Sequence, residues 1–225
     1  PLKPPHWYTR NQVVYEGQKI ALRKFNDDSK GNPLVIVPPE AGHDSTIVDY
    51  GSSQSLVESA LRNSDGDVYV LDRLPATASD TGYSIDNAVK AMDLAVDFIG
   101  ESVNLIGFCQ GGWQSAIYTA LFPEKVKLLT VAAGPIDFHA GESKIKSMVT
   151  TLPQSFYEQM VMLGSGNMPG SFIVTGFRMM NPVDRFMRDD LGLFNSIDDG
   201  KVIERVQQFQ SWYSRYQPVP GKMYL

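Results

Sequence analysis

The sequence has only one cysteine, Cys109, among its 225 residues. An internal disulfide and a cysteine-based zinc site are therefore excluded, which is typical of a protein from a reducing compartment. Long apolar runs are also missing, since no stretch approaches the roughly 20 residues that cross a bilayer. We predict a cytoplasmic protein without a membrane span. Because the chain begins at Pro1 and shows no signal-peptide pattern, we expect a fragment boundary there.

Positive charge is scarce: the sequence holds 20 lysines and arginines against 25 aspartates and glutamates, which gives a net charge of −5. It has no basic cluster interleaved with aromatic residues, so nucleic acid is not an expected partner. A dinucleotide is not expected either, because the glycines of residues 107–112 lack the GxGxxG spacing. The sequence indicates neither a cofactor nor a metal ion.

Strand-like apolar runs alternate with amphipathic helices along the first 136 residues. A lead-in hairpin is predicted over residues 12–25. Four further strands are predicted at Leu34–Val37, Val68–Leu71, Val103–Ile106 and Lys127–Ala132, with helices between them at Ser55–Leu61, Ser84–Ile99 and Trp113–Phe122. This alternation predicts an α/β fold in which a mostly parallel sheet is covered by helices on both faces.

The pattern changes after residue 136. Residues 137–217 lack clear buried strands, and helices are predicted there at Ser143–Thr150, Pro153–Leu163 and Lys201–Tyr213. We interpret residues 137–217 as a helical cap over a core formed by residues 1–136. Residues 218–225 are interpreted as the start of a return to the core.

A glycine-rich motif, residues 107–112, follows the strand that ends at Ile106. A strand, then G-x-C-x-G-G, then a helix is the context of a nucleophile elbow, in which glycines let the strand and helix backbones approach closely. Cys109 would start that helix, where free N–H groups and the helix dipole favour a thiolate. The motif predicts acyl transfer through an acyl-cysteine. The alternative is a small buried cysteine in a glycine-rich turn.

The same motif predicts an oxyanion hole beside Cys109. One expected donor is the backbone N–H of Gln110. The other is expected from the loop after the first buried strand, which contains Glu40, Ala41, Gly42 and His43. His43 could contact substrate there or form a structural hydrogen bond, and the sequence leaves both open.

A cysteine nucleophile needs a histidine base oriented by a carboxylate, and in hydrolases with this elbow the chain order is nucleophile, acid, histidine. His139 is the only histidine after Cys109, and Asp137 precedes it by two residues. Asp137 and His139 are therefore the candidate acid and base, although that spacing is short for side chains that usually lie on separate loops. The alternative for His139 is a cap or surface position.

Several motifs together resemble the superfamily of polyhydroxyalkanoate synthases and intracellular polyhydroxyalkanoate depolymerases, and its synthase-like relatives of unclear function. They are Val37-Pro38-Pro39, the GFCQGGW elbow, Ala133–Asp137, Asn181-Pro182 and Trp212–Gly221. The resemblance implies an α/β-hydrolase fold with Cys109 as nucleophile. It also implies a hydroxyacyl ester or thioester substrate, such as a hydroxyacyl-CoA or a polyester, and association with polyester granules.

In that superfamily the catalytic aspartate and histidine follow the cap, on strands that would come after Leu225. We therefore expect a chain truncated before its last strands, with the acid and base beyond residue 225. Two other interpretations stay open. One is a non-catalytic binding or granule-associated protein, and the other is a subunit whose sheet is completed in a homo-oligomer or by a partner chain.

Overall fold

The protein is described by a computed structural model that covers residues 6–27, 29–180 and 198–225. Its centre is a six-stranded sheet in the order β1-β2-β4-β3-β5-β6. The strands are β1 (Gln12–Gly17), β2 (Ile20–Lys24), β3 (Gly31–Val37), β4 (Gly66–Arg73), β5 (Val103–Phe108) and β6 (Val126–Ala132). β1, β2 and β4 pair antiparallel, whereas β4, β3, β5 and β6 run parallel. The predicted hairpin and mostly parallel sheet are confirmed.

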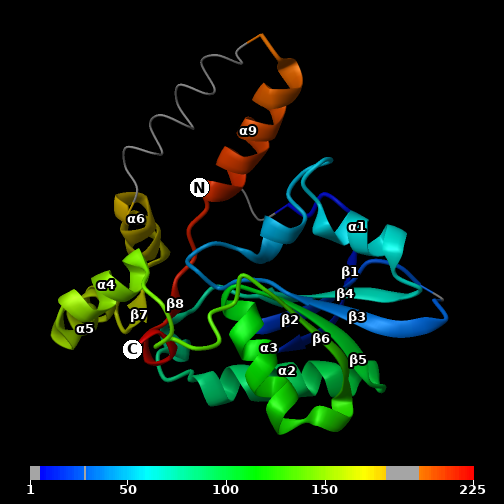
Figure 1. Ribbon diagram of the computed structural model, residues 1–225, viewed down its shortest axis with the longest axis horizontal. Coiled ribbons are helices and arrows are strands. Elements are labelled where there is room, and N and C mark those ends of the chain that lie inside the picture. Colours follow the sequence, from blue (N-terminus) through cyan, green and yellow to red (C-terminus); the bar gives the residue numbers. More distant parts are fainter. Residues whose placement is uncertain (1–5, 28, 181–197) are drawn as a thin grey trace.

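Helices cover both faces of the sheet, as predicted (Figure 1). α1 (Leu56–Asn63) lies on one face, and α2 (Ile85–Ile99) and α3 (Gln110–Leu121) lie on the other. Successive residues of a strand point to opposite faces. Ile36 of β3 therefore belongs to the apolar cluster of α1, with Val57. Its neighbour Val35 belongs to the cluster of α2, with Met92.

The connections between these elements also contain helical turns. They contain the 3₁₀ helices η1 (Ser45–Val48), η2 (Ala78–Asp80) and η3 (Pro123–Lys125). β6 is the last strand of the sheet on its side, and Leu128 on it is 60% exposed. Among the described residues, this edge of the sheet has no paired neighbour beyond β6.

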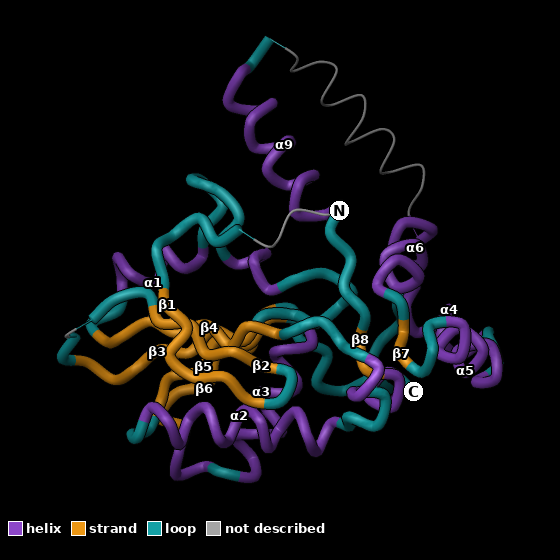
Figure 2. The backbone as a smooth tube through the Cα atoms, turned by 180° about the vertical axis from the view of Figure 1, so that it is seen from behind, coloured by secondary structure: helices purple, strands orange, loops and turns teal. Residues whose placement is uncertain are grey.

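Beyond β6 the described chain is mainly helical. α4 (Lys144–Thr151), α5 (Gln154–Leu163) and α9 (Gly200–Tyr213) agree with the predicted helices to within one residue at each end. In both views α4, α5 and α6 lie together beside the sheet, and α9 projects away from it (Figures 1 and 2). The Asn181-Pro182 motif lies outside the described residues.

Three elements of this part were not predicted: α6 (Gly170–Met180) and the short strands β7 (Asn167–Met168) and β8 (Val219–Pro220). They are followed by the single turn α10 (Gly221–Tyr224). β7 is fully buried and pairs antiparallel with β8, so the expectation of no buried strand in this region was wrong. The sequence of α6 contains two glycines and three β-branched residues before Phe177, which weakens its helical signal.

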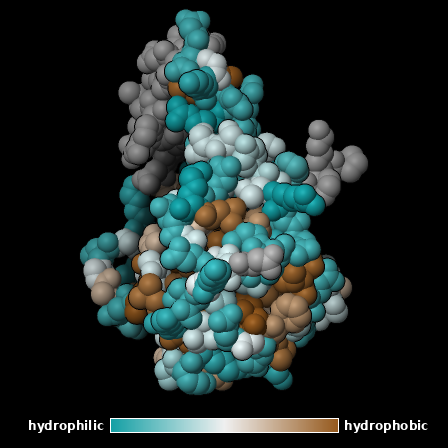
Figure 3. Space-filling model, turned by 90° about the vertical axis from the view of Figure 1, so that its right-hand side faces the viewer, coloured by the Kyte–Doolittle hydropathy of each residue, from teal (hydrophilic) through white to brown (hydrophobic). Residues whose placement is uncertain are grey.

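None of the described helices is both long and apolar enough to cross a membrane. On the face drawn in Figure 3, apolar residues form separate patches on the lower part of the molecule, and the upper part is mostly hydrophilic.

Candidate active site

Cys109 occupies the turn between β5 and α3. Its backbone has φ 50° and ψ −114°, a strained conformation for a residue with a side chain. The turn is held because the Cys109 N–H donates to the carbonyl of Ala132 at the end of β6, at 3.0 Å. The thiol is exposed. The alternative of a buried structural cysteine is therefore wrong.

Glycines around Cys109 permit close approach of the backbone segments. A Cβ at Gly107 would lie 2.7 Å from the Cα of Gly112, and a Cβ at Gly111 would lie 2.7 Å from the carbonyl oxygen of Pro38. These distances are shorter than real Cβ atoms tolerate. The start of α3 is therefore pressed against β5 on one side and against the segment after β3 on the other.

The two predicted oxyanion donors are brought to the same end of the sheet. Gln110 is the first residue of α3, where a backbone N–H has no acceptor within the helix. Val37 at the end of β3 is in register with Gly107 at the end of β5. The β3 loop, which we define as residues 38–44, thus leaves the sheet beside the elbow. Whether these amides bind an oxyanion stays a prediction.

Within the β3 loop, Ala41 is half-buried, and Glu40, Gly42 and His43 are buried. Glu40 is only 3% exposed, and this burial raises the pKa of its carboxyl group, although the positive charges of Arg73 and Lys19 oppose the shift. Gly42 has φ 85°, and its carbonyl accepts from the N–H of Gln217 at 2.9 Å.

His43 is surrounded by aromatic rings. Its ring centroid lies 4.5 Å from that of Trp212, 4.8 Å from that of Tyr213 and 5.7 Å from that of Tyr216. Its Nδ1 lies 2.9 Å from the carbonyl oxygen of Arg215, the geometry of an N–H donor to that acceptor. Burial lowers the pKa of His43. A structural hydrogen bond thus exists, and Nε2 has no partner among the described residues.

Asp137 and His139 lie on the exposed segment after β6. Asp137 Oδ1 accepts from the backbone N–H groups of His139 at 2.8 Å and Ala140 at 3.2 Å, so this carboxylate caps its own turn. The carbonyl of His139 accepts from Lys146 Nζ. In the described parts of the chain, no hydrogen bond joins either side chain to Cys109. Their roles as acid and base stay predictions.

Residues 10–221 match the model of a family described as "Protein of unknown function (DUF3141)". The chain belongs to this family. The match spans the sheet, the turn at Cys109 and the helical region after β6.

This DUF3141 chain is also similar to polymer synthase subunits. It is 29% identical to the poly(3-hydroxyalkanoate) polymerase subunit PhaC of Haloferax mediterranei, over 96% of this chain and 45% of that protein. It is 24% identical to the subunit of the same name from Allochromatium vinosum, over 89% of this chain and 58% of that protein. The chain thus spans about half the length of the curated relatives it matches. The resemblance to polyhydroxyalkanoate synthases is confirmed.

Among solved structures, the lipase-like protein lip1 of Acinetobacter baumannii superimposes with a TM-score of 0.50 at 16% identity. The alignment covers 69% of this DUF3141 chain and 53% of that one. This likeness establishes the fold, which is that of the α/β hydrolases.

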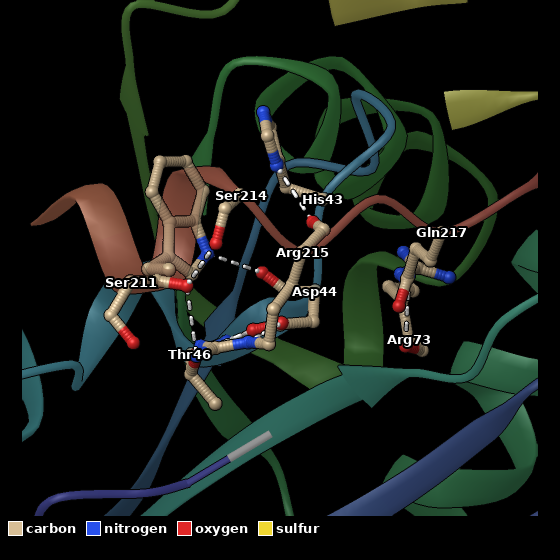
Figure 4. Close-up of polar contacts among 9 residues, drawn as sticks. His43, Asp44, Thr46, Arg73, Ser211, Ser214, Arg215 and Gln217 are labelled. Atoms are coloured by element: carbon tan, nitrogen blue, oxygen red, sulfur yellow. Dashed lines mark hydrogen bonds and ion pairs between the residues drawn. The ribbon is translucent and has the colours of Figure 1, made fainter. Parts of the chain in front are cut away.

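Sequence reasoning singled out Trp212–Gly221 as a family motif but did not predict that this segment contacts the β3 loop. The strap, residues 214–218, runs back from α9 across residues 42–46 of the loop and η1 (Figure 4). Arg215 donates from Nε to Asp44 Oδ2 at 2.7 Å and from Nη2 to Thr46 Oγ1 at 2.9 Å. Trp212 of α9 donates from Nε1 to the carbonyl of Asp44 at 3.1 Å. No local sequence signal connects residues so distant along the chain.

Proposed function

We propose that this DUF3141 protein catalyses acyl transfer or hydrolysis on hydroxyacyl thioesters or esters, with Cys109 as the nucleophile. The observation that carries the proposal is the elbow: an exposed thiol at φ 50°, between a parallel strand and the start of a helix. This backbone conformation costs free energy, and such strain persists mainly where function requires it.

In the proposed reaction, the Cys109 thiolate attacks the carbonyl carbon of the substrate, and a bond from Sγ to that carbon forms. The oxygen then carries a negative charge, which the N–H groups of Gln110 and of the β3 loop would stabilise. When the tetrahedral species collapses, the bond to the leaving thiolate or alkoxide breaks, and that group takes up a proton from the protonated base. A hydroxyl group of an acceptor, or water, then gives its proton to that base and attacks the acyl-cysteine, and the bond from Sγ to the acyl carbon breaks to release the thiolate of Cys109.

The similarity to PhaC subunits supports a hydroxyacyl substrate, because those relatives are named for polymerising poly(3-hydroxyalkanoate). We further propose residues 1–136 as the core that carries Cys109 and residues 137–217 as the cap that covers the acyl group. Placement in the cytoplasm and association with polyester granules belong to the same proposal.

The test uses 3-hydroxybutyryl-CoA and p-nitrophenyl butyrate as probes, with release of CoA thiol or of nitrophenol as the readout. Cys109 is the only cysteine, so one equivalent of iodoacetamide labels its thiol preferentially, and Cys109→Ala is the control for alkylation of other side chains. We expect alkylation to abolish turnover, and Cys109→Ala to lower kcat by at least about a thousandfold. A Cys109→Ala protein that keeps the activity would overturn the proposal.

The predicted acid and base are tested separately. If they act as such, Asp137→Asn and His139→Asn should each lower kcat at least about a hundredfold while the protein stays folded. A matched control is His6→Asn, which changes a histidine near the other end of the chain. Wild-type kcat in His139→Asn would identify this residue as a surface histidine.

A further inference from the structure

Arg73, at the carboxyl end of β4, contacts three different segments around the elbow. It is 2% exposed. Its backbone N–H donates to Ser45 Oγ at 2.7 Å in η1, and its carbonyl accepts from Gln217 Nε2 at 3.2 Å in the strap (Figure 4). Its side chain donates from Nη2 to Oε1 of Gln114 in α3. One buried side chain thus connects the sheet to the helix that begins at the nucleophile.

Gln114 is the other end of this hydrogen bond. It is 1% exposed and lies five residues after Cys109, which is about 7.5 Å along the axis of α3 at 1.5 Å per residue. The next residue, Ser115, donates from Oγ to the carbonyl of Gly111 at 2.6 Å. The hydrogen bond from Ser115 thus joins the second turn of α3 to its first turn. The hydrogen bond between Gln114 and Arg73 joins the second turn to β4.

The hydrogen bond between Arg73 and Gln114, here called the bridge, lies near the acidic residue Glu40 of the β3 loop. Glu40 is close enough to Arg73 and to Lys19 that both positive charges act on its carboxyl group. Arg73 Nε and Gln114 Nε2 are buried and have no hydrogen-bond partner among the described residues. Buried polar groups are retained without partners mainly where another requirement fixes them. The Arg73–Gln114 pair therefore calls for an explanation beyond its own hydrogen bond.

We propose that Arg73 and Gln114 are positioning residues of the candidate active site. Their bridge fixes the first turn of α3, and with it the Cys109 thiol and the Gln110 amide, relative to the β3 loop. This inference rests on the proposed function. An oxyanion donor misplaced by 1 Å can lower a rate by about a hundredfold, so a small rotation of α3 is expected to affect turnover.

Three variants of Gln114 separate positioning from mere stability. Gln114→Met keeps the side-chain volume and removes the oxygen that accepts from Arg73. Gln114→Asn shortens the side chain by one methylene. Gln114→Glu keeps an acceptor oxygen at the same distance from the backbone. With 3-hydroxybutyryl-CoA and p-nitrophenyl butyrate, we expect kcat to fall at least about tenfold in the Met and Asn variants. KM should change less than about threefold, and Gln114→Glu should stay within about threefold of wild-type kcat.

Wild-type kcat in a folded Gln114→Asn protein would overturn the inference, as would an increase in KM alone. If Gln114→Met does not fold, the inference is tested by comparing kcat of Gln114→Asn with kcat of Gln114→Glu. Should the wild type turn over neither probe, the same comparison is made on the rate of Cys109 alkylation. There, a threefold loss in Gln114→Asn supports the bridge and an unchanged rate refutes it. Activity that survives Cys109→Ala counts against the proposed function, not specifically against the bridge.

Discussion

The strap provides the sharpest prediction about stability, because one ion pair joins it to the β3 loop. The Asp44 side chain is 5% exposed and that of Arg215 is 14% exposed, and Nε and Oδ2 are 2.7 Å apart. In Arg215→Met the aliphatic stem keeps its packing, but the Asp44 carboxylate stays buried without its cation. Removal of one partner of a buried pair costs about 3–5 kcal/mol.

The lower end of that range applies here, because Asp44 Oδ1 still accepts from the Thr46 N–H at 3.1 Å. We therefore expect Arg215→Met to lower the free energy of unfolding by about 3 kcal/mol. For a chain of this size, each kcal/mol shifts Tm by about 2–4 °C, so Tm should fall by about 6–12 °C.

Urea unfolding followed by circular dichroism measures this change. The matched control is Arg62→Met, because Arg62 is 67% exposed and lies 3.7 Å from Glu58; it should change stability by less than about 0.5 kcal/mol. A double-mutant cycle with Asp44→Asn should give a coupling energy of about 1.5–3 kcal/mol. A loss below about 0.5 kcal/mol in Arg215→Met would refute the reasoning from burial.

Two further predictions concern the elbow and the β3 loop. Gly111→Ala should destabilise the protein by about 3 kcal/mol despite the better helix propensity of alanine, because its Cβ would lie 2.7 Å from the Pro38 oxygen and closer still to that of Val37. Gly82→Ala, with no atom within 4 Å of the added Cβ, is the control, and equal stability of the two variants would contradict the packing argument. For Glu40, a folded-state pKa above the ordinary value of 4.5 means that its stabilising contribution exists below pH 4.5 and is lost as the pH rises through the folded-state pKa. The unfolding free energy of Glu40→Gln relative to wild type should therefore rise between pH 4 and 7, and a decline over that range would show that the Arg73 and Lys19 charges outweigh burial.

Much of the core could be predicted because its signals are local. The run Leu34–Val37 is apolar at every position, since β3 lies between helices on both faces, and the structure places a strand there. Ser84 and Gly100 mark the ends of α2 because the first caps its N-terminus and the second adopts φ 84° after its last residue. The elbow was recognisable for the same reason. Its glycines are neighbours in the sequence as well as in space.

The surroundings of the elbow could not be predicted because they depend on distant pairs. Arg73 and Gln114 are 41 residues apart, and Asp44 and Arg215 are 171 apart. Arg73 lies in no motif, and the motif Trp212–Gly221 that contains Arg215 does not indicate which residue this arginine contacts. The predicted start of α3 at Trp113 was three residues late because the glycines of the elbow resemble a loop, whereas the helix begins at Gln110. Glycine is retained there for space and not for flexibility.

The strap also sets an order of events during synthesis. Arg215 leaves the ribosome 106 residues after Cys109, so the Cys109 thiol is made well before the strap that anchors the β3 loop. Contacts between segments this far apart form late in folding, since a long stretch of chain must first be closed. A nascent polypeptide therefore carries its thiol before the strap can anchor the β3 loop, and under the proposed function it would react with a thioester only after residues 214–218 have docked.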